Sequence, residues 1–310
     1  MKKRDKSFLT LLFFKSVLMG TVNKLPGISG GLVALITGFY IEMINSLKKL
    51  DFNIIKLLFS LNFKKINKDY NGTFLLIIFL GIVVSYFTTS QILDIFFQSY
   101  ELHVWSVFFG MILASNLILI LNNKKWDFQS MIMIGIGLLT GLLLSISEPI
   151  SENRNLFFIF FCGLISVCGM IIPGLSGSFL LIILGNFKLL LVDSVNSLYN
   201  SILIIFGIRS DIYHDFELIK IVLVFTLGSI SGLVLLSSIL SYLITNFEKT
   251  INQLIIGFVF GSLFIVWPWN YSINNFDFSF QNLFLLLWIL FGFFIVLIFN
   301  KYAKKLINMD

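Results

Sequence analysis

Charged residues are scarce in this sequence. Only 12% of its 310 residues are Asp, Glu, Lys or Arg, whereas a soluble domain has about 25%. Hydrophobic residues make up 57%, and apolar runs such as FLLIIFLGIVVSYF and NLFLLLWILFGFFIVLIF recur along the whole length. Long continuous runs are typical of membrane-spanning helices, not of the short alternating strands of a membrane barrel. The composition therefore predicts an all-α polytopic membrane protein.

Residues that hold metals or form disulfides are also few. The chain has two cysteines and two histidines. Cys162 and Cys168 lie in one apolar segment, so we expect packed thiols rather than a disulfide or a metal pair. We predict no metal site and no cofactor. The net charge of +6 reflects lysines in loops, and it does not indicate a nucleic-acid partner.

An internal repeat with an offset of 147 residues runs through the chain. The segment LPGISGG (Leu25–Gly31) aligns without gaps on IPGLSGS (Ile172–Ser178). The same offset pairs Gly38 with Gly185, Asn53 with Asn200, Phe59 with Phe206, Gly81 with Gly228, Ser90 with Ser237, Gly110 with Gly257 and Ser115 with Ser262. We therefore expect two repeats, residues 1–147 and 148–310.

Each repeat is predicted to contain five helical segments. They are 8–22, 31–47, 73–97, 102–121 and 130–147 in the first repeat, and 156–172, 178–192, 218–245, 251–268 and 279–299 in the second. The two segments that flank each Pro-Gly motif are short for a bilayer of about 30 Å. We expect them to form re-entrant hairpins over 8–47 and 156–192. The apolar segments 52–60 and 199–207 are too short to span and are predicted to lie along the membrane surface.

The basic residues indicate the orientation. With a cytoplasmic N-terminus, 16 of the 22 basic residues fall on the cytoplasmic side, in agreement with the positive-inside rule. Each repeat then crosses the membrane an odd number of times. The two repeats are therefore predicted to have opposite orientations, with both termini of the chain in the cytoplasm.

The duplicated PG-x-SG motif is the strongest candidate for a binding site. Pro26 ends the incoming helix, and Gly27, Gly30 and Gly31 permit unusual backbone and close ligand approach. Ser29 is expected to cap the outgoing helix, whose first amides attract anions. Broken helices in inverted repeats are typical of transporter substrate sites. Glycines elsewhere are expected to serve helix packing instead.

Ionisable residues within apolar segments are functional candidates. Lys15 and Lys24 lie close to the first break, where either could balance an anionic headgroup. Lys24 could equally reach out to the membrane interface. Glu42 could couple protons to transport or merely mark a helix end.

These motifs resemble those of the bacterial polyprenyl-phosphate transporter family. The first family motif appears as GTVNKLPGISGGLVALITGFY and the second as IPGLSGSFLLIILG, while FFGMILAS and GSLFIVWPW resemble later segments. The resemblance spans nearly the full chain. It departs from the family in having Ile41 and then Glu42 after Tyr40, and in having Lys24 at a position that is usually apolar.

The resemblance implies translocation of undecaprenyl phosphate, the C55 lipid carrier of envelope glycan synthesis, across the bacterial cytoplasmic membrane. The implied phosphate-binding residues are Asn23, Pro26, Gly27, Ser29, Gly30, Gly31, Pro173, Gly174, Ser176, Gly177 and Ser178. We expect a flippase that exposes this site alternately to each leaflet, and a coupling ion, H⁺ or Na⁺, is left open.

Two other functions are consistent with broken helices in a membrane. A polyprenyl-diphosphate phosphatase would be an enzyme, and phosphoryl transfer usually uses an arginine clamp. The three arginines, Arg4, Arg154 and Arg209, lie in tails or loops away from both motifs, so we expect no enzymatic activity. A transporter or channel for small inorganic anions is the other alternative.

Overall fold

In the computed structural model, the described residues are 5–47, 49, 53–60, 62–123, 126–146, 152–171, 175–208, 215–271 and 280–307. Every regular element within these ranges is a helix, which confirms the predicted all-α class. The predicted repeat boundary at 147/148 and both extreme termini lie outside the described residues.

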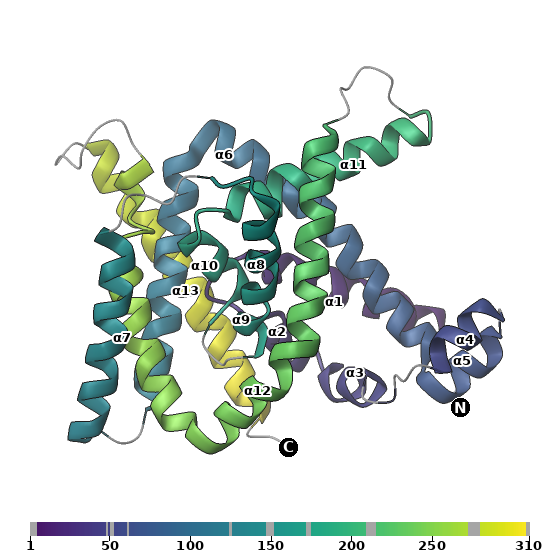
Figure 1. Cartoon of the computed structure of the whole chain (residues 1–310), viewed down its shortest axis with the longest axis horizontal. Helices are drawn as coiled ribbons and strands as arrows, with labels where there is room; N and C mark the ends of the chain where they lie inside the picture. Colours follow the sequence, from purple (N-terminus) through teal and green to yellow (C-terminus); the bar gives the residue numbers. More distant parts are fainter. Residues whose placement is uncertain are drawn as a thin grey trace. The chain divides into compact units, whose positions relative to one another are not determined.

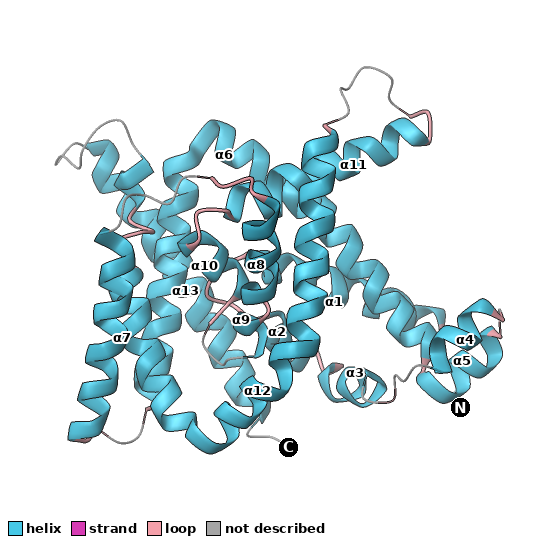
Figure 2. Ribbon diagram, in the orientation of Figure 1, coloured by secondary structure: helices cyan, strands magenta, loops and turns pink. Residues whose placement is uncertain are grey.

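The helices follow one another in this order: α1 (Lys6–Lys24), α2 (Gly30–Ile36), α3 (Tyr40–Leu47), α4 (Asn53–Phe59), α5 (Phe63–Tyr70), α6 (Gly72–Asn122), α7 (Phe128–Ile146), α8 (Leu156–Ser166), α9 (Cys168–Ile171), α10 (Gly177–Ile183), the π-helix η1 (Leu189–Asp193), α11 (Ser194–Ile205), α12 (Phe216–Ser262), the 3-10 helix η2 (Pro268–Tyr271) and α13 (Phe280–Ile307) (Figure 2). Cys162 and Cys168 are free thiols, as expected.

The helices form two compact units. One comprises Met1–Val22, Gly30–Thr88 and Phe299–Asp310, and the other comprises Asn23–Ser29 and Thr89–Ile298. The second unit therefore contains the loop of the first PG-x-SG motif together with α7 to α12. The predicted repeats divide the chain differently, by sequence and orientation, and they stay a prediction.

Several helices have the length and hydropathy of membrane spans. Among the described residues there are four such segments: Gly72–Asn122, Phe128–Ile146, Phe216–Leu236 and Leu283–Lys305, with mean hydropathies between 1.9 and 2.8. The bent pair α2 and α3 makes a fifth if it is counted as one span. The chain is therefore a multi-pass membrane protein.

The two longest helices each bend once. Straight, the 51 residues of α6 would extend about 76 Å, far beyond a bilayer core of about 30 Å. Non-helical backbone occurs at Tyr100 in α6 and at Phe247 in α12, which lie 147 residues apart. Figure 1 shows α12 folding back so that its second arm runs beside α7. The predicted segment pairs 73–97 with 102–121 and 218–245 with 251–268 correspond to the arms of these helices.

The second arm of α12 is shorter than predicted. It ends at Ser262 rather than at Pro268. The backbone then tightens into turns in which the Ile265 N–H donates to the Ser262 carbonyl and the Val266 N–H donates to the Leu263 carbonyl. Such i to i+3 bonds are common where a helix ends.

The prediction of unbroken helices over 31–47 and 178–192 was wrong. Gly38 and Gly185 have φ values of +81° and +69° and end α2 and α10. In both places the glycine N–H donates to the carbonyl three residues earlier, of Leu35 or of Ile182. The N–H of the following residue donates to the carbonyl five residues before it. This is the Schellman motif, which closes a helix with a left-handed residue. After the first break, α3 turns by 119° from α2.

Small residues allow the helices of the second unit to touch at their backbones. A Cβ on Gly137 of α7 would lie 2.1 Å from the Leu254 carbonyl oxygen, and one on Gly257 of α12 would lie 2.0 Å from the Ile134 carbonyl oxygen. This packing confirms the expectation of helix contacts for Gly137 and Gly257, whereas a Cβ on Gly135, for which the same was expected, would make no such contact with the described residues.

The same kind of crossing occurs between α6 and α13. A Cβ on Gly292 would lie 2.1 Å from the Val107 carbonyl oxygen, and one on Gly110 would lie 1.9 Å from the Ile289 carbonyl oxygen. Val107 and Gly110 precede Leu254 and Gly257 by 147 residues, whereas Gly137 precedes Gly292 by 155. The gapless offset therefore does not reach the last helix, where eight residues are added.

Candidate functional site

Ser176 organises the second PG-x-SG motif. It has extended backbone just before α10, and its Oγ accepts a hydrogen bond from the Phe179 N–H at 3.2 Å. This is an N-cap, which satisfies one amide at the start of the helix. The Ser178 hydroxyl donates to the same oxygen at 3.2 Å. Gly177 lies against α8, since an added Cβ would lie 2.5 Å from the Ser166 carbonyl oxygen.

The loop of the first motif contacts Ser176 directly. Helix α1 ends at Lys24, two residues before Pro26, as expected for a residue that cannot donate a helical hydrogen bond. Gly27 has a φ of +83°, and a Cβ there would lie 2.6 Å from the Met111 carbonyl oxygen. The Gly27 N–H donates to Ser176 Oγ at 3.1 Å. The two motifs, far apart in sequence, thus meet at this hydrogen bond.

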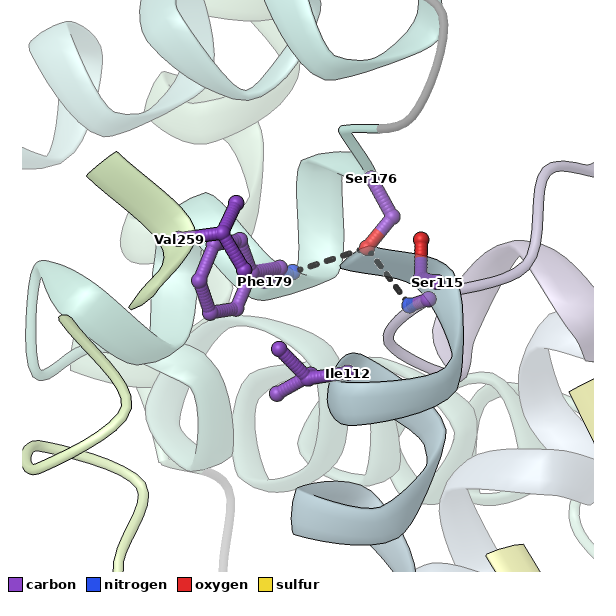
Figure 3. A pocket seen from close by; sticks show the side chains of 6 residues that line it. Ile112, Ser115, Ser176, Phe179 and Val259 are labelled. Atoms are coloured by element: carbon purple, nitrogen blue, oxygen red, sulfur yellow. Dashed lines mark hydrogen bonds between the residues drawn. The ribbon is translucent and has the colours of Figure 1, made fainter. Parts of the chain in front are cut away.

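A small pocket opens where the motifs meet. Its empty space is about 180 Å³, and it is lined by Gly27, Ile112, Ser115, Ser176, Phe179 and Val259. This figure includes space that is open to the outside, and the enclosed part has room for about one water molecule. A larger ligand group would therefore have to widen the pocket. Figure 3 shows the Ser176 hydroxyl directed toward the Phe179 amide, with the Ile112 and Val259 side chains nearby. The Gly27 N–H also donates to Ser176 Oγ.

Four of these lining residues were not predicted as site residues. Ser115 and Ile112 lie on α6, Val259 lies on α12, and Phe179 follows the second motif. Ile112 and Val259 are separated by 147 residues, so equivalent positions of the two predicted repeats face one pocket. Two sequence signals could have drawn attention to this part of α6: the pairing of Ser115 with Ser262, and the family-like segment FFGMILAS, which contains Ile112 and Ser115.

Lys24 is fully buried within the protein. Its Nζ donates to the Ser90 hydroxyl and, at 2.8 Å, to the Leu191 carbonyl oxygen. The sequence left two positions open for Lys24, one inside the protein and one at the interface. Its burial favours the position inside the protein.

Lys15 and Glu42 are positioned beside the break between α2 and α3. Lys15 Nζ donates to the Thr37 carbonyl oxygen at 2.6 Å, just after the C-terminus of α2. A cation at this end of a helix is favourable because its last carbonyls are unpaired. The Glu42 carboxylate accepts from Asn71 Nδ2 at 2.9 Å, and the same amide donates to Ser46 at 3.1 Å. Glu42 thus links α3 to the start of α6.

The remaining predicted residues lie in or beside the first motif loop. Pro26 and Gly30 are buried, while Asn23, Ser29 and Gly31 are half-buried. Pro173 and Gly174 of the second motif lie outside the described residues.

The apolar spans define a multi-pass membrane protein, and its two PG-x-SG motifs meet at a small, mostly apolar pocket. The model of the undecaprenyl phosphate translocase-like family matches residues 19–283. The chain therefore belongs to that family.

Two named relatives are similar over most of their length. A polyprenyl-phosphate transporter of Vibrio cholerae serotype O1 is 26% identical over 262 residues, which cover 84% of this chain and 79% of that protein. A polyprenyl-phosphate transporter of Staphylococcus aureus is 26% identical over 275 residues, with coverages of 85% and 88%. No solved structure matches the chain.

Proposed function

We propose that this protein is a flippase that moves undecaprenyl phosphate across the bacterial cytoplasmic membrane, returning the lipid carrier to envelope glycan synthesis. The observation that carries the proposal is the meeting of the two motifs at the pocket, through the Gly27 N–H and Ser176 Oγ. The names of the two relatives support a polyprenyl phosphate as the substrate.

The chemistry of the pocket suits a lipid phosphate. The hydroxyls of Ser115, Ser176 and Ser178 and the amide of Gly27 can each donate a hydrogen bond to phosphate oxygens, and such charge-assisted bonds are strong away from water. Here Ser176 is satisfied by groups of the protein itself. We therefore infer that phosphate binding replaces these bonds and widens the pocket, while the polyprenyl tail stays in lipid.

The proposed phosphate site comprises both motif loops: Asn23, Pro26, Gly27, Ser29, Gly30 and Gly31 from the first, and Pro173, Gly174, Ser176, Gly177 and Ser178 from the second. Helices α2 and α10 have seven residues each, so few peptide dipoles align behind either loop. The amides and hydroxyls of the loops are therefore more important than helix dipoles. For Lys15 and Glu42, the contacts at the α2–α3 break favour anchoring roles.

The proposed mechanism is alternating access by two inverted repeats, 1–147 and 148–310, each with a re-entrant hairpin, at 8–47 and 156–192. Three local correspondences support the duplication: the Schellman breaks at Gly38 and Gly185, the kinks at Tyr100 and Phe247, and the paired glycine crossings. Opposite orientations would present one motif to each leaflet.

Reconstitution into vesicles tests the function. Vesicles carry a labelled polyprenyl phosphate in both leaflets, and an added phosphatase that cannot cross the membrane hydrolyses the outer phosphates only. With an active flippase the whole pool becomes accessible, whereas half stays protected in protein-free vesicles. Continued protection of half the pool would contradict the proposal.

The same preparation separates the alternatives. Release of phosphate from a polyprenyl diphosphate by the purified protein alone would identify a phosphatase. Chloride or inorganic phosphate flux without lipid movement would identify an anion channel or transporter. Pro26→Ala and Ser29→Ala are expected to slow lipid movement, and an unchanged rate in both would remove the first motif from the site.

A further inference from the structure

A second polar cluster surrounds the buried ammonium of Lys24 in the same compact unit. Lys24 Nζ donates to the Ser90 hydroxyl and to the Leu191 carbonyl oxygen, and the Ser90 hydroxyl donates to that carbonyl at 2.9 Å. Two neutral oxygens that contact each other therefore accept hydrogen bonds from this ammonium.

The geometry of the chain around Leu191 makes its carbonyl available. Leu191 lies in the π-helix η1, a wide helical turn that occurs mostly as a local feature at functional sites. Its oxygen accepts two hydrogen bonds from outside its own helix. Asn196, on the next turn, donates through Nδ2 to the Ser90 carbonyl at 3.5 Å. Its Oδ1 is buried and has no hydrogen-bond partner among the described residues, so the amide that bonds to the Ser90 backbone has an oxygen with unused acceptor capacity.

Hydroxyl, carbonyl and amide oxygens are the ligands that hard cations prefer. In transporters, the irregular parts of broken helices supply such carbonyls to Na⁺. We propose that the Lys24 ammonium is a tethered cation, which fills an oxygen site that would accept Na⁺ if the lysine were uncharged. The second repeat has no equivalent lysine, because the residue 147 positions after Lys24 is Ile171.

This cation is directly connected to the motif loop. Lys24 is the last residue of α1, and Gly27, three residues later, donates to Ser176. A cation fixed on Ser90 and Leu191 therefore holds the start of the loop in place. It follows that the wild-type protein needs no metal ion at this position, whereas a protein without the Lys24 charge would use one.

Thermal unfolding of the purified full chain tests the proposal, with NaCl and choline chloride compared at equal concentration. In Lys24→Met we expect the Tm to be lower than wild type in choline and to rise by several degrees as Na⁺ is added, since an ion that binds only the folded state stabilises it. Wild type is expected to give the same Tm in both salts. The matched control is Lys188→Met, which removes an exposed lysine just before η1 and should not respond to Na⁺.

The double variant Lys24→Met/Ser90→Ala locates the ion, and it should lose most of the Na⁺ response. A Lys24→Met protein whose Tm ignores Na⁺, or a double variant that keeps the full response, would overturn the proposal. Should Lys24→Met be obtained folded only in NaCl, its unfolding after exchange into choline chloride would support the proposal. Failure to fold in either salt contradicts it. No lipid is present, so the result is independent of the proposed transport function.

Discussion

At the scale of single residues, the site depends on a backbone position that suits glycine alone. Gly27 has a φ of +83°, and a Cβ added there would lie 2.6 Å from the Met111 carbonyl oxygen. Gly27→Ala is expected to destabilise the protein by more than the ~1–2 kcal/mol cost of left-handed backbone, because the loop must also move away from α6. Thermal unfolding in detergent measures the loss.

Gly38→Ala is the matched control for this variant. Gly38 has nearly the same φ, +81°, but apart from its chain neighbours no described residue has an atom within 4 Å of an added Cβ. It should therefore show the conformational cost alone. Equal losses in the two variants would mean that the contact with Met111 has no energetic weight.

The sequence predicted one part of the site and missed another. The motif residues were found because proline, glycine and serine are unusual together in an apolar chain. Ile112, Ser115 and Val259 were missed because they lie in uninterrupted apolar helices, where nothing local marks a pocket wall. The partners of Lys24 depend on tertiary folding, since Ser90 and Leu191 are far from it in sequence.

At the scale of helices, close backbone contact between α7 and α12 is expected to stabilise the bundle. Gly137→Ala places a methyl group 2.1 Å from the Leu254 carbonyl oxygen, so the helices must separate. Small-to-large changes in packed regions usually cost about 1–3 kcal/mol. The variant should therefore unfold at a lower temperature or denaturant concentration than wild type.

Gly135, two residues away on the same helix, provides the comparison. Outside its own helix, a Cβ there would meet no atom of the described residues within 4 Å, and alanine favours a helix over glycine by about 1 kcal/mol. Gly135→Ala is expected to be neutral or slightly stabilising. A destabilisation as large as that of Gly137→Ala would argue against specific packing.

Helix types were easier to predict than helix ends. Continuous hydrophobicity predicted the spans, but Gly38 and Gly185 appeared as tolerated glycines within apolar runs. Both end their helices because a left-handed residue closes the last turn with two backbone bonds. Whether a glycine breaks a helix in this way depends on how the following residues pack, and a single sequence does not record that.

At the scale of the whole molecule, the inverted repeat predicts opposite orientations for equivalent loops. Ser60 and Ile208 are exposed residues at the ends of the related helices α4 and α11. In a chain with Cys162 and Cys168 replaced by alanine, a membrane-impermeant maleimide should label Ile208→Cys in intact cells. It should label Ser60→Cys only after the membrane is permeabilised. Labelling of both from the same side would rule out the inverted arrangement.

The central claim is that a lipid phosphate binds where the two motifs meet, and the translocation rate of Ser176→Ala in vesicles tests it most directly. Ser201→Ala is the control, because Ser201 is as buried as Ser176, at 6% exposed, and its hydroxyl donates to the Ser197 carbonyl within α11. A hydrogen bond to a charged group contributes about 1.5–3 kcal/mol. At equal amounts of folded protein, Ser176→Ala should therefore move undecaprenyl phosphate at least about tenfold more slowly than wild type, with Ser201→Ala near the wild-type rate. A wild-type rate in Ser176→Ala would contradict the account.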